Sequence, residues 1–174
     1  SVAVCRMPPQ STAHTSSNRS TAPGSISIVQ KEQWAQFPVM DRSVPNPYNN
    51  PKLDKYWNQR RRLFSRFDQG IQLDEEGWYS VTPEQIADHV ASRLVDLCQG
   101  SNIVVLDGFC GCGGNAIAFA KQPNISVIAV DLDRSKLRRA AHNAKLYDIP
   151  ANKIVFIECN VLFILEHCFR NGVF

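Results

Sequence analysis

The chain of 174 residues is 44% hydrophobic, which is enough for one domain of ordinary size with an apolar core. A formal net charge of +3 does not by itself indicate a nucleic-acid-binding protein, and no apolar run approaches the roughly 18 residues of a membrane span. The six scattered cysteines are typical of a reduced intracellular protein rather than a disulfide scaffold, and the first residues lack the pattern of a signal peptide.

The amino-terminal part of the chain divides by composition. Residues 1–50 are rich in Ser, Thr, Pro, Asn and Gln without a helical or strand period, which predicts a disordered leader. Residues 51–80 are predicted to form a basic helical extension, because cations alternate with apolar and aromatic side chains at nearly helical spacing as far as Phe67. Such a helix is either an ordinary solvated surface helix or an RNA-facing one, and the mixture of cations and flat rings favours the second. Residues 68–79 are predicted to be a loop.

Residues 81–174 are expected to form part of an α/β domain. Thr82 as the N-cap and Pro83 at the first helical position predict a helix that runs to Gly100. Its apolar stripe is expected to pack on the sheet that follows, and consists of Ile86, Ala87, Val90, Ala91, Leu94 and Leu97.

Three apolar runs then alternate with two helical patterns. Strands are predicted at residues 103–106, 125–130 and 154–157, with helices at 116–121 and 134–147 between them and a further helix from Val161. The order strand, helix, strand, helix, strand predicts three parallel strands joined by right-handed crossovers. The chain stops where a fourth such strand would be due.

A glycine loop, residues 108–114, follows the first predicted strand. Gly111 begins a G-x-G-x-x-A pattern, and Asp131 follows at the end of the next strand, as in dinucleotide-binding folds. A carboxylate at Asp107, directly before the loop, attracts a cationic ligand such as S-adenosylmethionine and repels a pyrophosphate. We therefore expect S-adenosylmethionine, with a nicotinamide or flavin cofactor as the alternative.

Other polar residues at this edge have competing interpretations. Asp131 is placed to hold ribose hydroxyls, or it is a carboxylate at a helix start. Asn160 follows the third strand and is either an adenine contact or a turn residue. Cys110 and Cys112 have no evident His partner for nucleophilic catalysis. A zinc site is not expected, because the paired spacing that it needs is lacking in Cys110, Cys112, Cys159 and Cys168.

Four segments together resemble the RNA cap guanosine-N2 methyltransferases, the trimethylguanosine synthase family. They are KYWNQR (55–60), LFSRFDQGI (63–71), EGWYSVTPE (76–84) and DGFCGCGGN (107–115). The resemblance implies a Rossmann-like class I S-adenosylmethionine methyltransferase core, here truncated after the third strand, with an N-terminal helical extension. It implies methylation of N2 in the 7-methylguanosine cap of small nuclear and nucleolar RNAs, giving 2,2,7-trimethylguanosine. It also implies a location in the nucleus, in nucleoli and Cajal bodies, and in the cytoplasm.

The resemblance also assigns site residues. Cofactor contacts are expected at Phe64, Thr82, Asp107, Gly108, Phe109, Gly111, Asp131 and Asn160, although the family usually has Asp at the last position. Substrate contacts are expected at Lys55 for the cap phosphates, at Asn143 near the guanosine and at Ser80 in the same cleft. No metal and no membrane are implied.

The family's acceptor-binding Pro-Pro-Trp segment would lie beyond Phe174, so no catalytic residue is assigned. A non-catalytic fragment that binds RNA or cofactor, and a nicotinamide-binding Rossmann half, are the alternatives.

Overall fold

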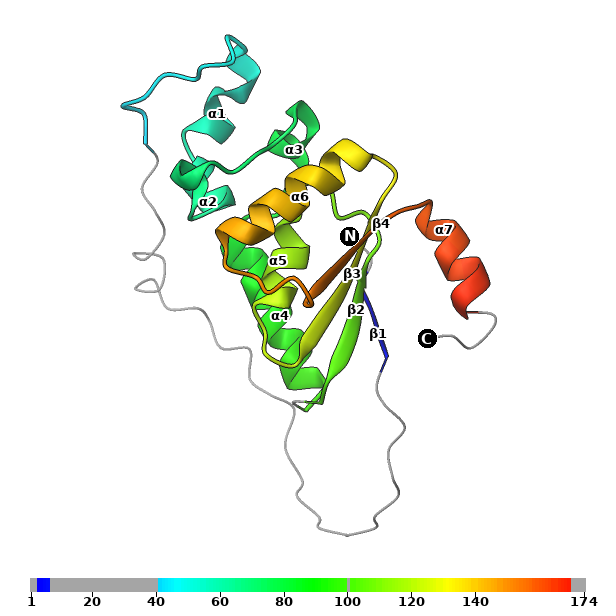
Figure 1. The fold of residues 1–174 in the computed structure, drawn as a ribbon. Helices are drawn as coiled ribbons and strands as arrows, with labels where there is room; N and C mark the ends of the chain where they lie inside the picture. Colours follow the sequence, from blue (N-terminus) through cyan, green and yellow to red (C-terminus); the bar gives the residue numbers. More distant parts are fainter. Residues whose placement is uncertain (1–2, 7–40, 100, 170–174) are drawn as a thin grey trace, which may run out of the picture.

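A computed structural model describes residues 3–6, 41–99 and 101–169. Its sheet has the strand order β1-β2-β3-β4 (Figure 1), and the strands are β1 (Ala3–Arg6), β2 (Ile103–Asp107), β3 (Ile125–Asp131) and β4 (Ile154–Glu158). The last three strands are parallel and in register, so that Asp107 lies opposite Ala129 and Asp131 lies opposite Glu158. The α/β fold with three parallel strands is therefore confirmed.

The first strand falls inside the predicted leader. Residues Ala3–Arg6 pair antiparallel with β2, along the edge that β3 does not occupy. An unpaired strand edge offers a row of backbone donors and acceptors that even a short segment can satisfy. At the other end of the leader, the backbone oxygen of Val44 accepts a hydrogen bond of 2.8 Å from the Trp57 indole. The described parts of residues 1–50 thus differ from the disorder predicted for them, and residues 7–40 lie outside the described part.

The extension is a series of short turns rather than the single amphipathic helix that the spacing predicts. It consists of 3₁₀ turns at Pro51–Leu53 and Phe67–Gln69 and of the helices α1 (Asp54–Trp57), α2 (Arg60–Leu63) and α3 (Glu75–Ser80). Gly70, at φ 103°, ends the second 3₁₀ turn. Helix α3 replaces the end of the predicted loop, because the Asp74 side chain accepts a 2.7 Å hydrogen bond from Gly77 N and caps it.

The aromatic residues of the extension form a core of their own. Trp57, Phe67 and Trp78 have ring centroids 5.4–5.9 Å apart, and Trp78 is buried. Edge-to-face and tilted pairs at these distances stabilise packing beyond the area that they bury. These rings therefore hold the extension together, which differs from the expectation that they stack on bases.

Several cations of the extension are paired with carboxylates. Arg60 is 3% exposed and lies 2.7 Å from Asp41, and Arg66 lies 2.6 Å from Asp148 across the boundary with the core. Arg60 and Arg66, two of the cations that were predicted to face RNA, therefore form ion pairs within the protein.

Helix α4 (Glu84–Leu97) faces the core differently from the prediction. Pro83 occupies the N-cap, so Thr82 does not cap the helix, and no side chain makes a capping hydrogen bond. Ala87 and Ala91 are buried against the neighbouring helix α5 (Gly114–Ala120), whereas Ile86 and Val90 are half exposed. Small side chains let two helices approach closely, which turns the larger ones of the predicted stripe toward solvent.

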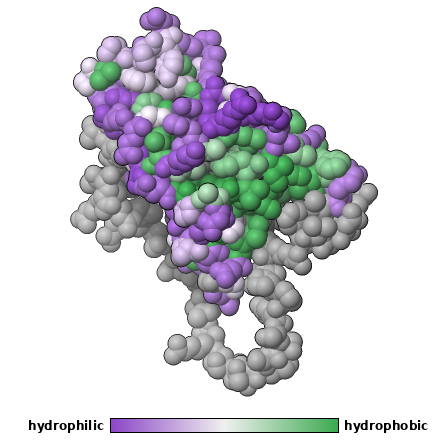
Figure 2. Space-filling model, viewed as in Figure 1, coloured by the Kyte–Doolittle hydropathy of each residue, from purple (hydrophilic) through white to green (hydrophobic). Residues whose placement is uncertain are grey.

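The two faces of the sheet are covered unequally. Helices α4, α5 and α6 (Arg134–Leu146) lie on one face, and the short helix α7 (Val161–Ile164) lies on the other (Figure 1). Val161 packs there with Leu106 and Val130, while Val104 and Val155 remain partly exposed. Figure 2 shows hydrophobic residues gathered on this side of the molecule, below α6. No helix in the described residues is long and apolar enough to span a bilayer.

Candidate functional site

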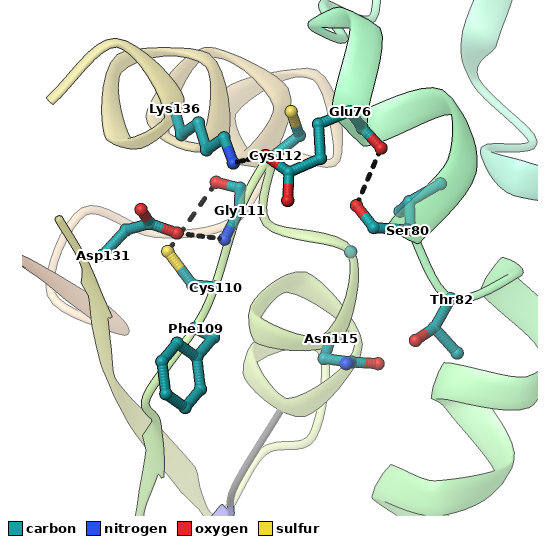
Figure 3. Close-up of a pocket in the computed structure, with 13 residues that line it drawn as sticks. Glu76, Ser80, Thr82, Phe109, Cys110, Gly111, Cys112, Asn115, Asp131 and Lys136 are labelled. Atoms are coloured by element: carbon teal, nitrogen blue, oxygen red, sulfur yellow. Dashed lines mark hydrogen bonds and ion pairs between the residues drawn. The ribbon is translucent and has the colours of Figure 1, made fainter. Parts of the chain in front are cut away.

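A cavity of about 300 Å³ opens at the carboxyl ends of β2 and β3, between the glycine loop and the extension. This is the edge at which open α/β sheets bind their ligands. Figure 3 shows Asp131 and Cys110 on one side of the cavity and Ser80 and Thr82 on the other. The lining residues are Glu76, Gly77, Ser80, Val81, Thr82, Phe109, Cys110, Gly111, Cys112, Gly114, Asn115, Asp131 and Lys136.

The glycine loop takes a tight path because two of its residues have positive φ. Gly111 has φ 51° and Gly113 has φ 90°. Gly113 N donates a 2.8 Å hydrogen bond to Cys110 O, and a Cβ on Gly113 would lie 3.0 Å from the Ala140 Cβ of α6. Glycine at 113 is therefore required twice, for the conformation and for the close approach of the loop to α6.

Asp131 holds the loop from the end of β3. Its Oδ2 accepts a 2.9 Å hydrogen bond from Gly111 N, and its Oδ1 accepts a 3.0 Å bond from Asp133 N. A carboxylate has about four lone-pair sites, so this group can accept further hydrogen bonds from a ligand in the cavity. Asp131 therefore lies where its carboxylate could accept hydrogen bonds from two adjacent hydroxyl groups of a ligand.

Asp107 lies beneath the loop rather than in the cavity wall. The residue is 1% exposed at the end of β2. Burial, reinforced by the negative charges of Asp107 and Asp131, raises the pKa of the Cys110 thiol above its ordinary range. Asp107 and Asp131 therefore both lie close enough to Cys110 to act on its thiol electrostatically.

An ion pair that the sequence did not predict joins the two walls of the cavity. Lys136 Nζ of α6 contacts Glu76 Oε2 of α3 (Figure 3). The hydrogen bond that Lys136 donates to Glu76 raises the pKa of Lys136, which therefore stays cationic. The only sequence signal for Lys136 was its place three residues after Asp133, the N-cap of α6. Nothing local pointed to Glu76, because the pair spans 60 positions.

The structure brings five of the predicted site residues to the cavity wall: Ser80, Thr82, Phe109, Gly111 and Asp131. Phe64 lies just behind it, buried against Gly114. Gly108 faces away, since a Cβ there would lie 2.7 Å from Val161 Cγ2 of α7. Asn160 caps α7 by accepting a 2.9 Å hydrogen bond from Leu162 N.

The two remaining predicted substrate contacts lie away from the cavity lining. Lys55 is exposed on α1, with its ammonium 4.6 Å from the centre of the Tyr56 ring. Asn143 is completely buried in α6, and its amide is engaged by Gln72 and Cys112. In this arrangement both amide hydrogens of Asn143 are used and the side chain is not exposed to the cavity.

The buried cysteines of the loop are expected to be unreactive. Burial raises the pKa of Cys112 from 9.0 to about 11, which lowers its thiolate fraction roughly 100-fold. We expect iodoacetamide at about pH 8 to alkylate the partly exposed Cys159 before Cys110 or Cys112. Peptide mass spectrometry over a time course measures the order of alkylation, and equal rates at the three thiols would contradict the burial of the loop.

No cluster that could hold a metal ion occurs among the described residues.

Comparison with known proteins agrees with this geometry. The sequence model of a family described as RNA cap guanine-N2 methyltransferase matches residues 102–173, which contain the glycine loop, Asp131 and Lys136. These residues belong to the RNA cap guanine-N2 methyltransferase family.

Two relatives of this methyltransferase segment are curated trimethylguanosine synthases. The one from Schizosaccharomyces pombe is 48% identical over 133 residues, which are 76% of this chain and 54% of the relative. The one from Saccharomyces cerevisiae is 44% identical over 104 residues, which are 59% of this chain and 32% of the relative. The chain thus spans about half the length of the first and a third of the second. A match of 133 residues does not fit within the methyltransferase segment alone, so the similarity also reaches the extension.

A solved structure described as the crystal structure of EvdMO1 aligns with 64% of this chain and 25% of its own. The TM-score is 0.39 and the identity is 17%, values too low to add to the family assignment.

Proposed function

We propose that this chain carries the cofactor-binding part of an S-adenosylmethionine-dependent methyltransferase that acts on N2 of guanosine in RNA caps. The observation that carries the proposal is the family match over the segment whose glycine loop and Asp131 line the cavity. The 7-methylguanosine substrate, the trimethylguanosine product and a nuclear location belong to the proposal, and the names of the two relatives support the product.

The charges around the cavity suit a cationic cofactor. Asp131 and Glu76 lie in its wall, Asp107 lies beneath it, and its Lys136 is neutralised by Glu76. Opposite charges attract and like charges repel most strongly where water is scarce, so this site favours a sulfonium over a pyrophosphate. This is the physical reason for preferring S-adenosylmethionine to a nicotinamide cofactor.

When bound, S-adenosylmethionine supplies an electrophilic methyl group on a sulfonium sulfur. The residues of this chain would mainly bind and orient. Asp131 would accept hydrogen bonds from the ribose hydroxyls, while Ser80 and Thr82 on the extension side would exclude water from the cavity. Correct placement of an acceptor amine can lower the barrier by about 7–11 kcal/mol through effective molarity. Acid or base assistance contributes little, because the leaving group is already good.

Binding calorimetry with this chain tests the cofactor. We expect S-adenosylhomocysteine to bind and NAD to give no heat, because the carboxylates of Asp107 and Asp131 repel a pyrophosphate. Transfer of a radiolabelled methyl group to 7-methylguanosine diphosphate, with guanosine diphosphate as the control, tests the acceptor with the full-length gene product. NAD binding without S-adenosylhomocysteine binding would overturn the proposal in favour of a nicotinamide protein.

A further inference from the structure

Asn143 is a polar side chain of the core whose hydrogen bonds all go to backbone groups. It lies on α6 with 0% exposure. Its Oδ1 accepts a hydrogen bond of 2.8 Å from Gln72 N, and its Nδ2 donates bonds of 2.9 Å to Gln72 O and of 2.9 Å to Cys112 O. Both amide hydrogens are used, so the group is satisfied entirely by the backbone of two distant segments.

These bonds tie the extension to the glycine loop. Gln72 lies between the second 3₁₀ turn and α3 of the extension, and Asn143 holds both of its backbone groups as a neighbouring strand would. The third bond reaches the residue just before Gly113. A second contact supports the same junction, because Cys112 Sγ lies 3.6 Å from Asp74 Oδ1 at the cap of α3.

The loop needs such a restraint because of its glycines. Gly111 and Gly113 have positive φ, and glycine visits many other conformations at little cost. A buried hydrogen bond to Cys112 O favours one loop conformation over the others, because leaving that carbonyl without a hydrogen bond costs free energy. The same amide requires Gln72 to be in place, because otherwise its own donor and acceptor would be unpaired.

We propose that Asn143 is a positioning residue that couples docking of the extension to the conformation of the glycine loop, so that the cavity has its binding shape only when the segment at Gln72 is seated. The coupling rests on the proposed function only for the identity of the ligand. It gives Asn143 a role different from the guanosine contact that the family resemblance implies.

The substitution Asn143→Asp tests the coupling with almost no change in shape. The carboxylate keeps the acceptor for Gln72 N but loses both donors and faces two carbonyl oxygens. We expect faster hydrogen exchange at the Gly113 and Gly114 amides, measured by NMR, and an affinity for S-adenosylhomocysteine weaker by about tenfold or more. Asn143→Ala removes the same bonds without adding a buried charge, and it serves if the Asp variant does not fold.

Tyr147→Phe, at the C-cap of the same helix, is the matched control. The Tyr147 hydroxyl donates a 2.7 Å hydrogen bond to Glu84 and accepts one of 3.4 Å from Arg66 N, so it also helps to hold the extension, but neither bond reaches the glycine loop. We expect this variant to lose stability while loop exchange and affinity stay within about twofold of the unmodified chain.

The outcomes separate the two proposals. Unchanged exchange at Gly113 and Gly114 in the folded Asn143 variants, or an equal rise in Tyr147→Phe, would overturn the coupling. Absence of S-adenosylhomocysteine binding to the unmodified chain would overturn the proposed cofactor, and the exchange comparison would still decide the coupling.

Discussion

Gly113→Ala is expected to destabilise the protein by about 2–5 kcal/mol and to abolish ligand binding at the cavity. At φ 90° an L-residue costs roughly 1–2 kcal/mol. The new methyl group would also lie 3.0 Å from Ala140 Cβ and 3.1 Å from Ala140 Cα, and such overpacking costs roughly 1–3 kcal/mol. Because the Ala140 Cα belongs to the backbone of α6, relief requires the loop to move away from the helix. Urea denaturation measures the free energy of unfolding, and calorimetry measures the binding.

Gly70→Ala is the control for the conformational part of that loss. Gly70 has φ 103°, but a Cβ there would meet nothing within 4 Å. We expect a loss of roughly 1–2 kcal/mol and unchanged binding, because only the backbone is strained. If Gly113→Ala and Gly70→Ala lowered the free energy of unfolding equally, the close contact between the loop at Gly113 and α6 would be contradicted.

Asp131→Ala is expected to weaken S-adenosylhomocysteine binding by roughly 10- to 100-fold. The substitution removes the acceptor of the Gly111 N hydrogen bond and the charge in the cavity wall. Hydrogen bonds to charged groups are worth about 1.5–3 kcal/mol, which corresponds to that range of affinity. Isothermal titration calorimetry with the same ligand measures the change.

Asp133→Ala controls for the loss of a carboxylate near the same strand end. Asp133 is exposed, caps α6 by accepting a 2.7 Å hydrogen bond from Ser135 N, and does not line the cavity. We expect a loss of about 1 kcal/mol in stability, typical of an N-cap, with affinity within about twofold of the unmodified chain. If Asp133→Ala weakened binding as much as Asp131→Ala, the effect would belong to α6 and not to the cavity.

The pattern of cations and aromatic residues in the extension is compatible with two structures, an RNA-facing helix and a segment packed within the protein. Cations beside aromatic residues predict an RNA-facing helix, yet Trp57 and Trp78 pack on each other and Arg60 is buried beside Asp41. Spacing along the chain describes which side chains share a face, but it does not say what that face meets. Here it meets carboxylates at residues 41, 68 and 148, of which the last is 82 positions from its partner Arg66.

The sequence by itself determined the three parallel strands, the glycine loop between β2 and α5, and a carboxylate at the ends of β2 and β3. These features follow from local signals, because apolar runs, glycines and acidic residues act on their immediate neighbours along the chain. Only the tertiary structure decided that Lys136 meets Glu76 across the cavity and that Asn143 hydrogen-bonds to the backbone of Gln72 and Cys112. Residues separated by 31 to 71 positions meet at Asn143, and such contacts depend on how the extension docks on the finished sheet, which no local pattern specifies.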